Sequence, residues 1–173
     1  NASEQKTDHK DIQESRKIMK IYTYKDIQKS RKMMLEKRIM DHEGFRKKIY
    51  KDSLGKQTIG YGHLITENDN FEEGIEYKKS DLLDLFYKDL EKAREGANQL
   101  VGHITELHIE AKNCIIEMVF QLGTQGVRNF KKMILALEEK DYFEAHVQML
   151  DSRWAKQTPQ RCIDLSEIMK KCV

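Results

Sequence analysis

Two acidic residues, Glu43 and Asp52, stand where their surroundings should give them opposite protonation states. Glu43 falls in the last turn of a predicted helix, where unpaired carbonyls make the helix end negative, so we expect its proton to be held more tightly than usual. Asp52 opens a polar turn and should stay ionised. A protonated carboxyl beside an ionised one is the arrangement that glycoside hydrolysis uses. On these two positions alone, ordinary surface acids remain the simpler interpretation.

The residues after Asp52 favour the chemical interpretation. Gly60 and Gly62 interrupt a predicted strand, and one common reason for glycine inside a strand is a ligand that approaches the backbone. Thr58, two residues before Gly60, should point to the same face and could offer its hydroxyl to a water molecule. We interpret His63 as a structural histidine bonded to a carboxylate rather than as a catalyst.

Other chemistries fit the sequence less well. His42 and Glu43 begin a string like that of zinc proteases, but Arg46 stands where the second histidine belongs. No complete dinucleotide or phosphate-binding loop is present, and aromatic residues do not alternate with basic ones as a nucleic-acid platform requires. Three cysteines lack metal-ligand spacing, and their odd number leaves a disulfide undecided: Cys114, Cys162 and Cys172.

The hydrophobic pattern predicts the elements that must position these residues. A helix over 33–43 should stop at Gly44, which is the preferred residue just past a helix end. Alternating character over 45–66 predicts a hairpin, and Ser80 is the expected N-cap of a helix over 81–98. Residues 105–171 read as helical with breaks at 122–126 and 158–159. We therefore predict an α+β, mainly helical fold with a small β-hairpin lobe, a connecting long helix and a helical C-terminal lobe, and a cleft between the lobes.

Length and charge add an appendage to this body. The chain has 173 residues and a mean hydropathy of -0.75, and no apolar run approaches the ~18 residues of a membrane span. Residues 1–40 hold 11 Lys and Arg against 6 Asp and Glu, whereas the remainder holds 20 against 23. Within the basic part, residues 10–19 recur at 25–34 with eight of ten positions identical. We predict a basic, internally duplicated helical arm over 1–32 and one domain over 33–173. The arm could contact an anionic surface or a protein partner, or be a solvated extension without a role.

Several ordered blocks resemble one known family. Residues 41–52 and 58–64, with the spacing Glu-x8-Asp-x5-Thr, closely resemble the active-site hairpin of phage-type lysozymes (glycoside hydrolase family 24). Residues 118–123, 126–127, 152–154 and 157–161 look like later motifs of that family. Together these blocks cover most of residues 33–171.

The resemblance implies a role for each matching position. Glu43 matches the general acid, Asp52 the second catalytic carboxylate and Thr58 the residue that holds the attacking water. Arg161 matches the arginine that pairs with the acid, and His63 and Asp89 match a structural salt bridge. Four positions fall where the family contacts substrate: Leu64, Phe120, Gln121 and Gln148. Two departures are Met133, which replaces a small polar cleft residue, and the loop over 67–79, which is shorter than in the T-even phage member.

The implied activity is hydrolysis of the β-1,4 bond between N-acetylmuramic acid and N-acetylglucosamine in peptidoglycan, with inversion. The resemblance implies no metal or organic cofactor, and we expect a monomer that binds peptidoglycan and not nucleic acid. Because the substrate is a bacterial wall, the protein should be exported or released to it (secreted, periplasmic or phagosomal), although no apolar signal segment follows the N-terminus. Two alternatives are a lytic transglycosylase acting on the same bond and a non-catalytic protein that binds walls or membranes through the basic arm.

Overall fold

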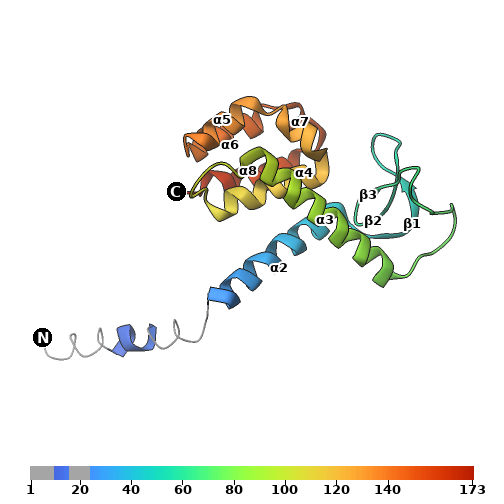
Figure 1. The fold of residues 1–173 in the computed structure, drawn as a ribbon, viewed down its shortest axis with the longest axis horizontal. Helices are drawn as coiled ribbons and strands as arrows, with labels where there is room; N and C mark the ends of the chain where they lie inside the picture. Colours follow the sequence, from blue (N-terminus) through green and yellow to red (C-terminus); the bar gives the residue numbers. More distant parts are fainter. Residues whose placement is uncertain (1–9, 16–23) are drawn as a thin grey trace, which may run out of the picture. The chain divides into compact units, whose positions relative to one another are not determined.

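The computed structural model describes residues 10–15 and 24–173 (Figure 1). The chain divides into two compact units, residues 1–38 and 39–173. The first unit contains a helical stretch at 10–15, which is exposed throughout, and most of helix α2 (Tyr24–Glu43). The rest of the first repeat lies outside the described residues. Helix α2 begins nine residues before the predicted position 33, so it runs across the predicted boundary between arm and domain, which stays a prediction.

Helix α2 ends where the sequence predicts. Gly44 adopts a φ of 71°, a backbone conformation that glycine takes without steric cost, and its N–H donates to the carbonyl of Met40 at 2.9 Å. This turn directs the chain away from the helix axis directly after Glu43. The carboxyl of Glu43 therefore lies at the junction of the helix with the strands that follow.

A three-stranded antiparallel sheet follows, as the hairpin pattern predicts. Its strands are β1 (Arg46–Lys51), β2 (Gln57–Gly60) and β3 (His63–Leu64), paired in the order β1-β2-β3. Tyr50 on β1 pairs with Thr58 on β2, and Ile59 pairs with His63 on β3. Ile59 is fully buried, so the sheet has one face toward the protein interior.

Helix α3 (Lys79–Val101) contacts both the sheet and the helical part of the body. Near its start, Leu82 packs beside Gly60 and the ring of Phe86 lies 5.4 Å from that of Tyr61. The prediction that Ser80 caps this helix is wrong: Lys78 is the N-cap residue, without a side-chain hydrogen bond, and Ser80 lies within the first turn. The helix starts earlier because Asp81 and Leu82 both donate backbone hydrogen bonds to the carbonyl of Lys78.

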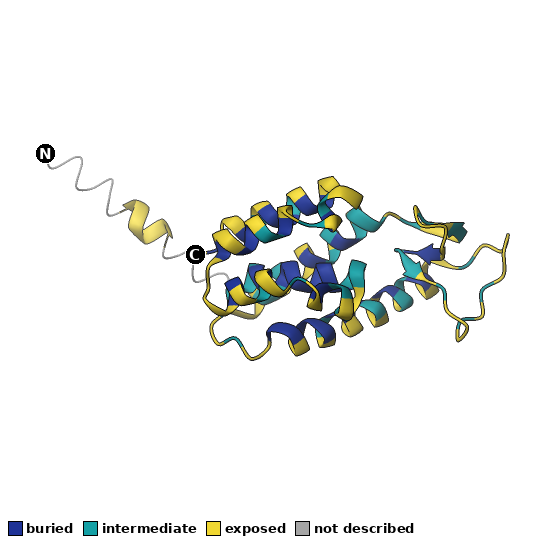
Figure 2. Cartoon of the chain, turned by 90° about the horizontal axis from the view of Figure 1, so that it is seen from above, coloured by how far each residue is buried: buried dark blue, intermediate teal, exposed yellow. Residues whose placement is uncertain are grey.

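The remaining helices form the main core. They are α4 (Ile109–Arg128), α5 (Lys131–Glu138), α6 (Tyr142–Leu150), α7 (Arg153–Gln157) and α8 (Pro159–Lys170). In α4 every residue over 113–119 is buried, and buried residues in the body gather where its helices meet (Figure 2). The predicted breaks occur at Gly123, whose φ is 75°, and between α7 and α8 at Thr158. The three cysteines are buried, and none of them forms a disulfide bond. Among the described residues, no helix combines the length and hydropathy needed to cross a membrane.

Candidate active site

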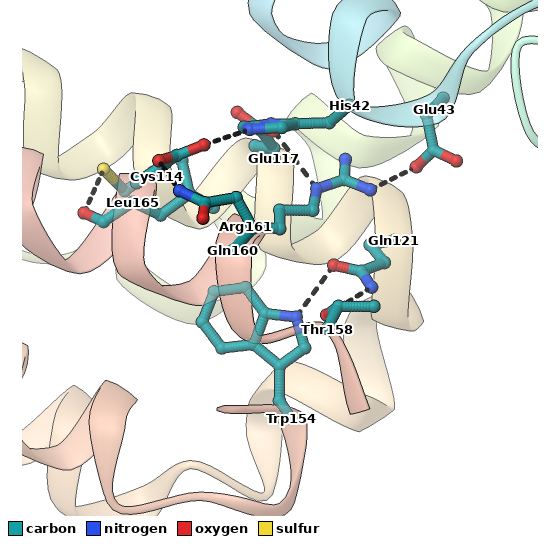
Figure 3. Close-up of polar contacts among 11 residues, drawn as sticks. His42, Glu43, Cys114, Glu117, Gln121, Trp154, Thr158, Gln160, Arg161 and Leu165 are labelled. Atoms are coloured by element: carbon teal, nitrogen blue, oxygen red, sulfur yellow. Dashed lines mark hydrogen bonds and ion pairs between the residues drawn. The ribbon is translucent and has the colours of Figure 1, made fainter. Parts of the chain in front are cut away.

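The side chain of Glu43, at the end of α2, is largely buried and has a different neighbour at each carboxyl oxygen. Its Oε1 accepts a hydrogen bond from Nη1 of Arg161 at 2.6 Å (Figure 3). Its Oε2 lies against the turn between β2 and β3, so a Cβ atom added to Gly62 would come within 2.1 Å of it. Gly62 therefore lies in a turn rather than inside a strand, and the Glu43 carboxyl lies directly beside its backbone.

The surroundings of Glu43 raise its pKa above the usual 4.5. Burial is the largest cause, since it disfavours the charged form. The charge and hydrogen bond of Arg161 lower the pKa, the negative charge of Glu117 raises it, and the charge of His42 lowers it. The direction agrees with the sequence-based expectation. The cause differs, because that expectation rested on the negative helix end.

A chain of polar and charged side chains connects Glu43 to Asp164 by way of the fully buried Glu117. Nε of Arg161 donates to Oε1 of Glu117 at 3.2 Å, and the same Glu117 oxygen contacts Nδ1 of His42. The other ring nitrogen of His42 lies 2.8 Å from Oδ2 of Asp164. Helices α2, α4 and α8 each contribute to this network, which is defined by five residues: His42, Glu43, Glu117, Arg161 and Asp164 (Figure 3). We call it the buried network after Glu117 and Arg161 at its centre, which are buried, whereas Asp164 at its end is partly exposed.

The second carboxyl, Asp52, is held by a tight turn after β1. Its Oδ1 accepts backbone hydrogen bonds from Leu54 and Lys56, both at 2.8 Å. The backbone N–H of Asp52 also donates to the carbonyl of Lys56 at 2.9 Å. Both side-chain bonds end on Oδ1, which fixes the orientation of the carboxylate while using only one of its oxygens.

Thr58 lies on β2, close in sequence to this turn, and is 4% exposed. Its hydroxyl donates to the carbonyl of Lys56 at 3.0 Å. Because that bond uses the hydroxyl proton, the Thr58 oxygen can act toward a further partner only as an acceptor.

Tyr50, opposite Thr58 on β1, is electrostatically coupled to both acids. Burial is the largest cause of a raised pKa at its phenol, the charges of Glu43 and of Asp52 raise it further, and Arg46 lowers it. Tyr50 therefore lies within electrostatic range of the two carboxyls that the sequence singled out.

His63, at the start of β3, lies between two carboxylates. Its Nδ1 is 2.7 Å from Oδ2 of Asp89, the partner implied by the resemblance, and its Nε2 is 3.1 Å from Oδ2 of Asp69. Burial alone would lower the pKa of His63, but the hydrogen bonds and charges of Asp89 and Asp69 outweigh it and raise the pKa. Asp69 also accepts from the N–H and hydroxyl of Thr66, so the cluster fixes the start of the loop after β3.

The four expected substrate contacts lie in different surroundings. Gln121 on α4 accepts from the indole N–H of Trp154 at 2.8 Å and donates to the hydroxyl of Thr158 at 3.1 Å. The ring of Phe120 packs against that of Phe86, and Leu64 is 46% exposed.

Gln148, the fourth of these positions, lies on α6 and donates to Glu144 at 2.7 Å. It lines a pocket of about 620 Å³ together with Trp154 and Met133. Met133 is fully buried, so it contributes an apolar wall to that pocket.

Sequence reasoning missed several members of the site. Glu117 carries a usable signal, because it is a single acid inside the apolar run 115–119 of a predicted helix. Asp164 follows Arg161 by three residues, which places both on one face of a helix. Tyr50 and Asp69 carry no such signal, because only the folded hairpin and loop bring them to their partners.

Comparison with known proteins gives a consistent result. The family model for phage lysozyme matches residues 40–167. The chain is 34% identical over 141 residues to "Probable T4-type lysozyme 2" of Dictyostelium discoideum, covering 69% of this chain and 83% of that protein. It is 36% identical over 141 residues to "Probable T4-type lysozyme 1" of the same organism, with the same coverage. The "Pre-baseplate central spike protein Gp5" of Enterobacteria phage T4 is 28% identical over 148 residues, which are 73% of this chain and 26% of that protein.

Proposed function

The chain belongs to the phage lysozyme family and is a muramidase acting on peptidoglycan, and we propose that Glu43 is the general acid of its reaction. The scissile bond in this proposal is the β-1,4 bond between N-acetylmuramic acid and N-acetylglucosamine. The observation that carries the assignment is the environment of Glu43, whose buried carboxyl lies against Arg161 and has a raised pKa.

A general acid must hold its proton until the glycosidic oxygen arrives and then release it. Burial favours the protonated form of Glu43, and Arg161 stabilises the carboxylate that remains after transfer. These two opposed effects suit a group that changes charge during the reaction. The proton moves to the leaving-group oxygen as the bond to the anomeric carbon breaks.

We propose that Asp52 and Thr58 bind and orient the water that attacks the sugar. The water can donate one hydrogen to the Thr58 oxygen, because the hydroxyl proton of Thr58 is used on the Lys56 carbonyl. It can donate the other hydrogen to Asp52, whose Oδ2 is not used by the hydrogen bonds of the turn. The lone pair of the water then faces the anomeric carbon, and Asp52 takes the proton as the new bond forms.

Attack by such a water on the face opposite the leaving group inverts the configuration of the sugar. An inverting enzyme needs space for the water between its two carboxyls, which are then roughly 6.5–9.5 Å apart. We propose this outcome for Glu43 and Asp52. Proton magnetic resonance of the first product would identify the anomer, and mass spectrometry would detect the anhydro sugar that a lytic transglycosylase leaves.

Further parts of the proposal concern the rest of the chain. We propose that Leu64, Phe120, Gln121 and Gln148 contact the glycan strand, and that His63 and Asp89 stabilise the hairpin rather than react. The protein would act as a monomer after export or release to the wall by a secreted, periplasmic or phagosomal route. The arm over 1–32 would not take part in hydrolysis.

The direct test is clearing of peptidoglycan suspensions by the wild type and by Glu43→Gln, with folding checked by circular dichroism. The amide keeps the shape of the side chain but cannot donate the proton, so we expect a loss of roughly 10²-fold or more. The matched control is Glu138→Gln, since Glu138 is a partly exposed acid on α5 whose partner is His103. Appreciable clearing by folded Glu43→Gln would overturn the assignment of the acid.

A further inference from the structure

Glu117 is a buried acid that the proposed reaction does not use directly. Its side chain has no exposed surface, and its neighbours on both sides in α4 are apolar and buried. Burying a carboxylate is costly unless it is paired and hydrogen-bonded. The partners of Glu117 therefore indicate what this carboxylate does.

One oxygen of Glu117 joins the side chains of Arg161 and His42, which come from different elements. Its Oε1 accepts from Nε of Arg161 on α8 at 3.2 Å and contacts Nδ1 of His42 on α2. His42 in turn contacts Asp164 through Nε2, and Gln160 donates to the other oxygen of Asp164 at 2.8 Å (Figure 3). Ionised carboxylates only accept hydrogen bonds, so both His42 contacts at once require a proton on each ring nitrogen or on one of the carboxyls.

We propose that Glu117 and His42 are positioning residues for the acid: Glu117 holds the guanidinium of Arg161 so that Nη1 faces Glu43, and His42 holds Glu117 in place. The inference rests on the proposed role of Glu43. It extends the machinery inward to two residues that contact neither the substrate nor the reacting atoms.

The geometry of Arg161 explains why a second carboxylate is needed. The guanidinium is a planar group, and a single bond through Nη1 would leave its plane free to rotate. The bond from Nε to Glu117 fixes that plane. Nη2 is buried and has no hydrogen-bond partner within the described part of the chain, so Nε and Nη1 determine the orientation.

The two residues also act on Glu43 through their charges, and in opposite directions. Glu117 raises the pKa of Glu43 and His42 lowers it. The other charged groups facing this region are Arg161 and Asp164 from α8, and Tyr50 on β1 responds to the charge of Glu43. Because Glu117 and His42 shift the pKa of Glu43 in opposite directions, replacing each of them should move that pKa in opposite directions. General destabilisation of the fold would not produce two opposite shifts.

The experiment compares the full-length wild type with Glu117→Gln and His42→Asn. For each protein, kcat and KM on soluble peptidoglycan fragments are measured against pH, and the Glu43 carboxyl is titrated by carbon-13 magnetic resonance. Glu117→Gln keeps an acceptor oxygen but removes the charge, so the Glu43 titration and the alkaline limb of kcat should move to lower pH. His42→Asn should move both to higher pH.

A third variant separates position from charge. Glu117→Met also removes the acceptor, so kcat at its pH optimum should fall roughly tenfold with KM nearly unchanged, because the acid is then less well placed. Glu117→Gln should retain most of kcat at its own optimum. Glu138→Gln, in the His103–Glu138 pair outside the network, should leave every readout unchanged. If Glu117→Met does not fold, kcat of His42→Asn at its own optimum gives the positional readout, because this variant removes the group that holds Glu117. A kcat equal to that of the wild type there would overturn the positioning role.

The outcomes distinguish the inference from the proposed function. Titrations of Glu43 that stay unchanged, or that move in the same direction in Glu117→Gln and His42→Asn, would overturn the inference. If the titrations move in opposite directions while the limbs of kcat do not follow, the network acts on Glu43 as inferred and the role of Glu43 as the acid is wrong.

Discussion

The buried network around Glu43 and the hairpin that carries Asp52 hold two carboxyls by opposite means. Glu43 is largely enclosed and is paired with a buried arginine from a distant part of the sequence. Asp52 is fixed by backbone N–H groups within four residues of itself. Burial favours the protonated form of Glu43, whereas the turn leaves one Asp52 oxygen for water. Local structure is therefore sufficient to hold the proposed base, whereas the proposed acid needs the tertiary fold.

Both regions also contain a histidine between two carboxylates, with different consequences. His63 contacts Asp69 and Asp89, and this cluster ties β3 and its following loop to α3. His42 contacts Glu117 and Asp164, and Glu117 also binds the arginine that faces the acid. A histidine between two carboxylates thus connects to the arginine beside Glu43 in the buried network, whereas in the hairpin it holds a loop against α3.

The largest effect should come from Asp52→Asn. The amide oxygen can still accept from Leu54 and Lys56, so the turn should stay intact, but the group can no longer take a proton from water. We expect a loss of roughly 10²-fold or more in kcat with little change in thermal stability. Asp84→Asn, at an exposed acid on α3, is the control. Turnover by folded Asp52→Asn close to that of the wild type would remove Asp52 from the mechanism.

The contrast between locally fixed and tertiary-fixed groups also explains which features could be predicted from the sequence. The end of α2 at Gly44, the hairpin and the break at Gly123 follow from local signals, because glycine takes positive φ at all three sites. Glu43 and Asp52 could be singled out as candidates from their places in these elements, but it is the family resemblance that favours them over ordinary surface acids, and their roles stay a prediction. Glu117 and Tyr50 could not be assigned, because their partners lie on other elements that only the folded chain brings close.

A smaller effect is expected from replacing Gly62 by alanine, and the same replacement at Gly74 serves as its control. Both adopt positive φ, at 71° and 78°, so replacement by alanine should strain either turn by about 1 kcal/mol. Only at Gly62 would the added methyl group meet the carboxyl of Glu43. Gly62→Ala should therefore lose additional stability and roughly tenfold in kcat, because the acid is displaced, while Gly74→Ala keeps its kcat. Urea unfolding and kinetics measure both, and equal behaviour of the two variants would contradict the close packing of Glu43 on this turn.

The His63 cluster should affect stability rather than catalysis. The pKa of His63 is higher in the folded protein than its unfolded value of about 6.5. The contribution of protonated His63 to the free energy of unfolding is therefore fully present below about pH 6.5 and is lost as the pH rises through the pKa of the folded state. His63→Asn should thus reduce the free energy of unfolding by about 1–3 kcal/mol at pH 6 and by less at pH 9. Denaturant unfolding at both pH values checks this, and an equal loss at both would show that the ion pairs do not stabilise the hairpin.

The smallest effect is expected from deletion of residues 1–32. Hydrolysis of soluble fragments should stay unchanged, because neither region of the comparison includes the arm. A peptide of residues 1–32, tested for leakage from anionic vesicles, examines the alternative in which the arm is the active part. Loss of hydrolysis in the folded truncated protein would mean that the arm is required for the site.

The most direct test of the two carboxyl roles is hydrolysis of a synthetic wall glycoside whose leaving group is dinitrophenol. Such a leaving group needs no protonation, so Glu43→Gln should recover to within about tenfold of the wild-type rate on this substrate while its activity on peptidoglycan stays roughly 10²-fold or more below that of the wild type. Asp52→Asn should stay slow on both substrates, because the water still lacks its base. If Glu43→Gln is equally impaired on both substrates, Glu43 is not the general acid, and the contrast between the buried network and the hairpin does not describe the reaction.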